Sequence, residues 1–331
     1  MTLIKTYRKT LMTNPIANKT SSIGSRLRYS YLIATSYSGS TLLSMLLDTH
    51  PEIVSIGELA NEVWKPGRTT KYYCSCGSEI SQCKFWIDVK ERCAGRGMEL
   101  DLYDFDLKLD LGWGRLANKL AFGVAAHYGR LRSVLDILTD HVPAKNMKVN
   151  FVADRTTALV HAILEASGKT HFFDTSKEIR RAMYLSADGR MHTRVIHLVR
   201  DPRAVLHSFL RRKRSTRVNQ VLNFWMRTHT NALRLKSRIA PSDYLLVHYE
   251  ELCRAPEETL DLVCQFLGVQ PYPIVSEVND HVHHVIGNEM RNQRVRSIEC
   301  DDEWRTDLPQ PLNAKCKQRT AGLAAELGYS F

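Results

Sequence analysis

Residues 31–43 read YLIATSYSGSTLL. A short apolar run leads into a turn rich in hydroxyl side chains, and leucines at helical spacing follow the turn, namely Leu42, Leu43, Leu46 and Leu47. A strand, a tight turn and a helix in this order direct the backbone N–H groups of the turn, and the positive end of the helix dipole, at one place. Because such a place binds phosphate or sulfate, we predict an anion-binding loop at residues 35–41.

A second anion-binding segment, RDPRAVLHS, occupies residues 200–208 and directly follows the apolar strand pattern of residues 195–199. Arg200 offers the forked guanidinium that suits phosphate, and Pro202 takes the first helical position, which proline favours. Ser208 lies two helical turns further on, where it can reach a ligand that follows the start of the helix. The two segments together suggest a ligand with anionic groups at both ends.

Predicted strands alternate with predicted helices along the chain, which indicates an α/β fold with a central parallel sheet covered by helices on both faces. Strands are predicted at 31–34, 53–56, 171–174, 195–199 and 244–249, and helices at 96–150, 156–168, 178–185, 204–213, 216–240, 256–267 and 310–326. We expect residues 1–29 to form a flexible leader and residues 30–331 to form one domain. A cysteine-containing loop and a helical insertion are expected at approximately 60–150.

The chain of 331 residues carries a formal net charge of +11, and 44% of its residues are hydrophobic. Excess positive charge attracts polyanions in general, but no nucleic-acid-binding module is readable, so no nucleic acid is expected as a partner. No apolar run approaches the roughly 18 residues of a transmembrane segment, and the basic N-terminus lacks the apolar centre of a secretory signal. A cytoplasmic location is therefore expected, although a targeting role of the N-terminus stays open.

Four of the eight cysteines cluster within residues 74–93, namely Cys74, Cys76, Cys83 and Cys93. Structural zinc sites usually show paired Cys-x2–4-Cys motifs, and this spacing departs from them. A disulfide that ties the loop, or a set of buried thiols, is therefore preferred to zinc. Three histidines, His281, His283 and His284, have no carboxylate or cysteine partner at ligand spacing, so we interpret them as loop residues beside a ligand.

The anion-binding loop, the Arg-Asp-Pro-Arg-x-x-x-x-Ser segment and their order along an α/β chain resemble the sulfotransferase family, over most of residues 30–305. The similarity is greatest to the branch of Golgi carbohydrate, tyrosyl-protein and many bacterial sulfotransferases. That branch typically shows Arg-Ser-Gly-Thr-Thr-Leu, then a helix, His-Pro and Gly-Glu. The corresponding residues here are YSGSTL at 37–42, HP at 50–51 and GE at 57–58.

The resemblance implies a P-loop-like domain that transfers a sulfuryl group from 3′-phosphoadenosine-5′-phosphosulfate (PAPS) to a hydroxyl or amine and releases PAP, with no required metal. The acceptor is expected to be a small molecule or a glycan. The resemblance also implies that the first loop binds the 5′-phosphosulfate and that the second segment, together with a late glycine-containing loop, binds the 3′-phosphate. The residues so implied are Ser38, Gly39, Ser40, Thr41, Arg200, Ser208 and Arg291.

The chemistry of transfer is assigned by the same resemblance to Glu58 and Lys177. Glu58 would act as the general base that takes the proton of the acceptor. The family usually places Lys or Arg where Tyr37 stands, so another cation must neutralise the charge that develops as sulfuryl transfers. Lys177 is the nearest candidate, although it could equally be a surface lysine beside a helix-starting cap.

Two other functions stay open at this stage. Tyr37 in place of a basic residue is compatible with a catalytically silent protein that only binds a nucleotide. A small-molecule kinase is the weaker alternative, because no Walker lysine follows Gly39 and no carboxylate is placed by a motif to hold Mg²⁺.

Overall fold

The computed structural model describes residues 26–60, 72–114, 118, 122, 142–212, 217–273, 283–285 and 298–331. Five strands in this part of the chain form one sheet: β1 (Leu27–Ile33), β2 (Ile53–Val54), β3 (His171–Asp174), β4 (Met191–Val199) and β5 (Tyr244–His248). Their order is β2-β3-β1-β4-β5, and every neighbouring pair is parallel. The predicted parallel α/β sheet is therefore confirmed.

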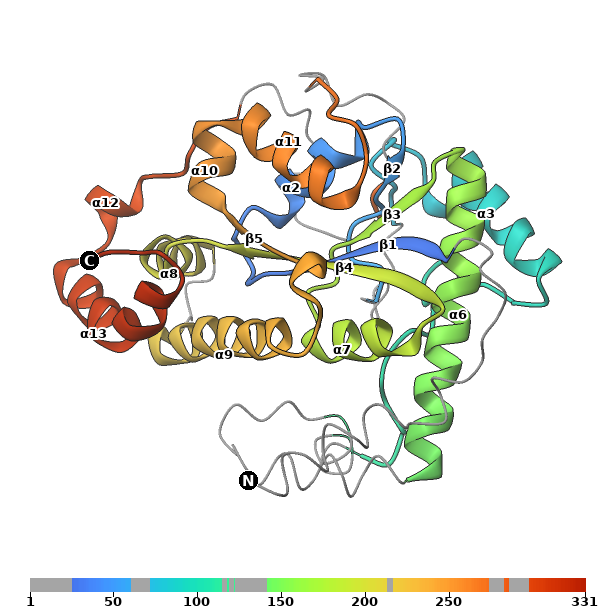
Figure 1. Cartoon of the computed structure of the whole chain (residues 1–331), viewed down its shortest axis with the longest axis horizontal. Helices are drawn as coiled ribbons and strands as arrows, with labels where there is room; N and C mark the ends of the chain where they lie inside the picture. The colour runs from blue at the N-terminus through green and yellow to red at the C-terminus, as the bar shows by residue number, and fades with distance from the viewer. Residues whose placement is uncertain are drawn as a thin grey trace.

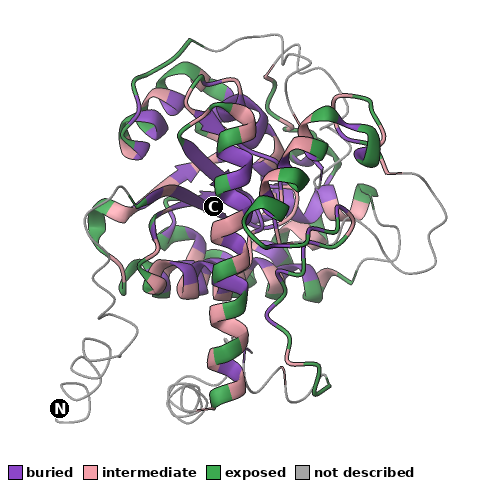
Figure 2. Ribbon diagram, turned by 90° about the vertical axis from the view of Figure 1, so that its right-hand side faces the viewer, coloured by how far each residue is buried: buried purple, intermediate pink, exposed green. Residues whose placement is uncertain are grey.

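Helices cover both faces of the sheet (Figure 1). One face carries α2 (Ser40–Asp48), α10 (Tyr249–Arg254) and α11 (Pro256–Leu267), and the other carries α7 (Ile179–Asp188) and α9 (Val218–Lys236). Side chains alternate across each strand, so Leu32 and Ile196 pack with α2 and α11, whereas Tyr31 and Val195 belong to the core on the opposite face. Strands β2 and β3 are wholly buried, and β1 and β4 are buried over most of their length, as expected of a parallel sheet covered on both faces (Figure 2).

Two helical groups flank the sheet. At the end beside β1 and β3, α6 (Pro143–Ser167) packs against α3 (Lys84–Gly95), which follows the short η2 (Ile80–Gln82). At the other end, α8 (Pro202–Arg212), α9, α12 (Trp304–Asp307) and α13 (Gln310–Glu326) share an apolar core that includes Trp225 and Trp304. The remaining element, η3 (Pro241–Asp243), leads into β5.

Two expectations about the chain's organisation differ from the structure. Strand β1 begins at Leu27, so the domain boundary predicted at residue 30 lies inside a strand. Residues 98–110 are not helical but follow an irregular, extended path in which Met98, Leu100, Leu102, Phe105, Leu107 and Leu109 are buried. Polar neighbours alternate with them at a period of two over residues 98–102 and again over 105–110, which suits extended chain and not a helix.

All four loops of functional interest leave the same edge of the sheet. In a parallel sheet the carboxyl ends of the strands meet at one edge, and ligands of α/β proteins bind there. The loop at 34–39 follows β1, residues 55–60 follow β2, residues 175–178 follow β3, and Arg200 follows β4. The fold thus collects the predicted site residues from segments that lie far apart in the sequence.

Candidate functional site at the carboxyl edge of the sheet

The anion-binding loop closes on a glycine that no other residue can replace without strain. Gly39 precedes α2 with φ +82, a left-handed conformation, and its carbonyl accepts the hydrogen bond of Leu43 N at 3.0 Å. A Cβ on Gly39 would overlap the aromatic ring of Tyr249. Within the loop, the buried hydroxyls of Thr35 and Ser38 share a hydrogen bond of 2.5 Å. The geometry therefore presents the first-turn N–H groups of α2, at Ser40 and beyond, toward the sheet edge.

Two residues of the predicted site have a strained, left-handed backbone conformation. Among the described residues, three that are not glycine have positive φ, namely Tyr37 (64°), Asp106 (49°) and Lys177 (65°). Tyr37 and Lys177 belong to the predicted site. Left-handed backbone costs such residues on the order of 1 kcal/mol or more, and it persists where surrounding structure enforces it.

Arg200 joins the end of β4 to the anion-binding loop. Its Nη1 donates to the carbonyl of Tyr37 at 2.9 Å and to Ser208 Oγ at 3.4 Å, and its guanidinium lies 4.3 Å from the ring centroid of Tyr249. The side chain is buried, with only 5% of its surface exposed. The structure thus brings Arg200 together with Ser208, eight residues away in the sequence, and with Tyr37 of the loop, 163 residues away.

An acidic neighbour of Arg200 was missed by the sequence analysis. Arg200 Nη2 donates to the carbonyl of Asp301 at 2.7 Å and lies 3.3 Å from its carboxylate Oδ2. Arg211 Nη2 also lies 3.3 Å from that carboxylate. A carboxylate therefore stands where the sequence analysis expects a phosphate, and no signal in the sequence linked Asp301 to the site.

Glu58 and Lys177 meet on the other side of the loop. Lys177 Nζ donates to Glu58 Oε1 at 2.6 Å, and the two side chains are 18% and 17% exposed. The turns that carry them are bonded together, because Thr175 N donates to the carbonyl of Gly57 at 3.1 Å and Ala60 N donates to Ser176 Oγ at 2.8 Å. The two residues predicted for the chemistry of transfer thus form one half-buried ion pair.

The buried carboxylate of Asp174 holds the turn that carries Lys177. Asp174, the last residue of β3, accepts hydrogen bonds from Ser176 N at 2.8 Å and Tyr29 OH at 2.5 Å, and it lies 3.5 Å from Arg181 Nε. Burial, followed by the nearby charge of Asp174, raises the pKa of Tyr29 well above its ordinary value, so the phenol stays a neutral donor. The turn that carries Lys177 is therefore anchored to the core.

The sheet order separates the two sides. Because β1 lies between β3 and β4, the anion-binding loop stands between Arg200 and the Glu58–Lys177 pair. Two further contacts complete the loop: the ring of Phe209 packs edge-on against Tyr37 at 4.7 Å, and the Arg212 guanidinium lies 5.6 Å from the Tyr37 ring centroid. Arg212, which the sequence analysis did not single out, therefore places a cation beside Tyr37, the position at which the sequence departs from the family pattern. Arg291 lies outside the described residues.

The interpretation of the histidines requires a correction. His283 Nδ1 lies 3.6 Å from Cys74 Sγ and 3.5 Å from Cys83 Sγ, so this histidine does have cysteine partners. His284 Nε2 lies 3.7 Å from the carboxylate of Asp48. Residues that are remote in sequence supply these partners, which is why spacing alone did not reveal them. All eight cysteines are described and have free thiols, and Cys74, Cys83 and Cys93 are buried, so of the two preferred alternatives the structure has the buried thiols and not the disulfide.

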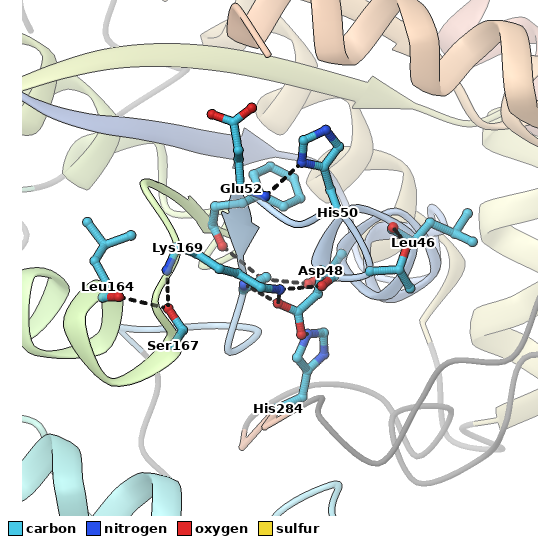
Figure 3. Close-up of polar contacts among 12 residues, drawn as sticks. Leu46, Asp48, His50, Glu52, Leu164, Ser167, Lys169 and His284 are labelled. Atoms are coloured by element: carbon cyan, nitrogen blue, oxygen red, sulfur yellow. Dashed lines mark hydrogen bonds and ion pairs between the residues drawn. The ribbon is translucent and has the colours of Figure 1, made fainter. Parts of the chain in front are cut away.

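A polar network fixes the end of α2 (Figure 3). Asp48 accepts hydrogen bonds from Ser55 N at 2.9 Å and from Lys169 Nζ at 3.3 Å, and its carboxylate faces His284. His50 uses both ring nitrogens within the protein: Nδ1 accepts from Glu52 N at 3.0 Å, and Nε2 lies 2.8 Å from the carbonyl of Gln270. These contacts give His50 a structural role at the end of α2.

Comparisons with known proteins support the resemblance seen in the sequence. A family model described as the sulfotransferase family matches residues 131–273. A Caenorhabditis briggsae protein named as a protein-tyrosine sulfotransferase is 26% identical over 159 residues, which are 46% of this chain and 55% of that protein. Mouse carbohydrate sulfotransferase 1 is 26% identical over 185 residues, covering 46% of this chain and 43% of its own length. The chain thus spans about half the length of these curated relatives.

The fold comparison agrees. The sulfotransferase domain of an olefin synthase from Synechococcus PCC 7002 superposes with a TM-score of 0.53 at 19% identity, covering 94% of this chain and 98% of that domain. The resemblance to the sulfotransferase family is thus confirmed, and the fold is similar to that of a sulfotransferase domain. Among the described residues, no helix has the length and apolar character needed to cross a membrane.

Proposed function

We propose that this protein transfers a sulfuryl group from PAPS to a hydroxyl or amine of an acceptor. One observation carries the proposal: the anion-binding loop stands between a buried arginine–serine pair, Arg200 and Ser208, and a half-buried acid–base pair, Glu58 and Lys177. The loop and the Arg200–Ser208 pair can each bind one anionic end of such a ligand. The Glu58–Lys177 pair supplies the acid–base groups that transfer from one of those ends requires.

The nucleotide would lie along the carboxyl edge of the sheet. Its 5′-phosphosulfate would accept hydrogen bonds from the backbone of residues 38–41, where Ser40 and Thr41 add hydroxyl donors. Its 3′-phosphate would accept from Arg200 and Ser208, as charge-assisted contacts. Since Arg200 Nη2 now pairs with Asp301, the phosphate would replace that carboxylate. Arg291 is proposed, from the resemblance, to contribute from its loop.

The transfer step would use the Glu58–Lys177 pair. Glu58 takes the proton of the acceptor hydroxyl while the oxygen attacks sulfur in line; the bond between sulfur and the bridging phosphate oxygen breaks, and PAP leaves. Lys177 stabilises the negative charge that grows on the bridging oxygen, and Arg212 stands beside Tyr37, where relatives carry the basic residue. Positioning and electrostatic stabilisation dominate such a step, and the resemblance to sulfotransferases implies no required metal.

The acceptor is proposed to be a small molecule or a glycan that lies against the segments around residues 60–150. Aromatic side chains for stacking are available there, because Tyr73 and Trp113 are 48% and 60% exposed. A cytoplasmic location is part of the proposal, and the free thiols of all eight cysteines suit a reducing compartment.

A second candidate is a catalytically silent nucleotide-binding protein. The observation that favours it is Tyr37, an aromatic residue at the position where relatives carry a cation. Such a protein would keep Arg200 and the loop but would transfer nothing.

A transfer assay separates the two. Purified protein is incubated with radiolabelled PAPS and with acceptors of three classes, namely sugars, phenols and aliphatic alcohols, and PAP release is measured by chromatography. The proposal expects acceptor-dependent PAP release that is lost in Glu58→Gln. PAP binding without release on any acceptor class would support the silent protein instead.

A further inference from the structure

We infer that Cys74, Cys76, Cys83 and His283 form a structural zinc site. Their ligand atoms, three Sγ atoms and an imidazole nitrogen, all lie within 4.8 Å of one another. Cys74 and Cys83 are buried, while Cys76 and His283 are half-buried. Thiolates and imidazole are the ligands that zinc prefers in proteins, and a set of three cysteines and one histidine is a common structural combination.

The distances match the edges of a zinc tetrahedron. Zn–S bonds of about 2.3 Å and Zn–N bonds of about 2.0–2.1 Å give S···S edges of roughly 3.8 Å and S···N edges of roughly 3.6 Å. The structure has Cys76 Sγ 3.6 Å from Cys83 Sγ, and His283 Nδ1 3.6 Å and 3.5 Å from the Sγ atoms of Cys74 and Cys83. Three of the six ligand–ligand distances thus match a zinc tetrahedron, and all four ligand atoms lie within 4.8 Å of one another.

Local structure holds each ligand in place. Residues 74–78 form a tight turn, in which Gly77 N donates to the carbonyl of Cys74 at 2.9 Å and Gly77 has φ +87. Cys83 stands immediately before α3. The ring of Phe85 stacks on His283 with centroids 4.4 Å apart and planes 1° from parallel, which fixes the direction of the imidazole.

The principal alternative is a disulfide between Cys76 and Cys83, whose sulfurs lie 3.6 Å apart. A disulfide would use two of the four groups and would explain neither the approach of His283 to two sulfurs nor the convergence of Cys74. A zinc ion uses all four. Because every coordination position is then filled by protein, the site is closed to substrate, and its role is structural and not catalytic.

The zinc site would connect two parts of the proposed active site. Ser75 N donates to the carbonyl of His284 at 3.0 Å, His284 N donates to Ser75 Oγ at 2.9 Å, and Val285 N donates to the carbonyl of Ile56 at 3.0 Å. Ile56 lies two residues before Glu58, and the ring of His284 faces Asp48 at the end of α2 (Figure 3). Zinc would therefore fix residues 283–285 between β2 and the helix that follows the anion-binding loop.

The test measures metal content and not activity. The whole chain is purified without added metal or chelator, zinc is measured by mass spectrometry, and free thiols are counted after denaturation. We expect about one zinc per chain, and eight free thiols per chain once the metal is removed. Cys76→Ser should lower the zinc content at least severalfold, whereas Cys300→Ser, a change of an exposed cysteine outside the cluster, should leave it unchanged.

A cobalt titration of the wild-type chain keeps the test independent of variants that fail to fold. Metal-free protein should bind one Co²⁺ with the strong visible absorption of tetrahedral cobalt and a thiolate-to-cobalt charge-transfer band, and zinc should abolish both. Metal-free protein that binds neither ion under reducing conditions, or a Cys76–Cys83 disulfide in freshly purified protein, would overturn the inference. None of these readouts depends on PAPS or on transfer.

Discussion

The two sides of the anion-binding loop are built differently. On the β4 side, Arg200 is buried and donates to the main-chain carbonyls of Tyr37 and Asp301. On the β2–β3 side, Glu58 and Lys177 are half-buried and meet in a side-chain ion pair. A group fixed by main chain is preorganised, which suits binding, whereas a pair of side chains on two turns can exchange partners, which suits transfer of a proton and a sulfuryl group. The comparison predicts that binding and turnover are lost separately.

Glu58→Gln is expected to have the largest effect. The amide keeps the shape of the carboxylate but cannot take a proton, so turnover should fall about 10²–10⁴-fold, the range of a lost general base. The PAP dissociation constant, measured by calorimetry, should stay within about twofold because the nucleotide is bound on the other side of the loop.

The matched control is Glu178→Gln, since Glu178 is a half-buried carboxylate on the same turn that pairs with Arg180 at 2.6 Å. It should retain most of the activity. Full turnover in Glu58→Gln would show that Glu58 is not the general base. The predicted separation of binding and turnover between the two sides of the loop would then be wrong.

Arg200→Ala tests the opposite side. Loss of its charge-assisted contacts should weaken PAP binding by about 1–3 kcal/mol, which is roughly 5- to 150-fold in the dissociation constant. Arg190→Ala is the control, because Arg190 stands at the amino end of β4 and its removal changes the net charge equally. Equal losses in the two variants would mean that overall charge, and not the site, binds the nucleotide.

Ser208→Ala sharpens the same side at lower amplitude. Its hydroxyl lies 3.4 Å from Arg200 Nη1, and a single hydrogen bond contributes about 1 kcal/mol, so PAP affinity should fall roughly fivefold. Thermal unfolding of the variant, followed by circular dichroism, should be nearly unchanged. An unaltered PAP affinity would place Ser208 outside the 3′-phosphate site.

Asp301→Asn should act in the reverse direction. The carboxylate lies 3.3 Å from Arg200 and competes with an incoming phosphate, so its neutralisation should tighten PAP binding by about two- to fivefold, the scale of a partly exposed ion pair. The gain should shrink as salt is raised. Weaker binding in this variant would mean that Asp301 orients Arg200 for the nucleotide instead of competing with it.

The parallel sheet and the grouping of site segments were predictable from the sequence, because apolar strand patterns and helix-starting turns are local signals. Val199 and Arg200 show this well, since a buried strand followed by RDPR fixes both the end of β4 and the start of α8. The extended path at residues 98–110 could also have been predicted, because apolar and polar residues alternate at a period of two over 98–102 and 105–110, a pattern that does not suit a helix.

Contacts between remote segments were beyond the sequence. The pairing of Arg200 with Asp301 joins residues 101 positions apart, and the approach of His283 to Cys74 joins residues 209 positions apart. Side-chain partners of this kind depend on how loops at the sheet edge pack, which no local pattern encodes. The ion pair between Glu58 and Lys177 is intermediate: both residues were singled out, but their direct contact was not foreseen.

The most direct test of the central claim is a calorimetric titration of the purified chain with PAP, with ATP and ADP as controls. The account predicts saturable binding of one PAP per chain, at least tenfold tighter than ATP, because the buried Arg200 side of the loop is built for a 3′-phosphate that ATP lacks. Absence of PAP binding, or equal affinity for ATP and PAP, would contradict it.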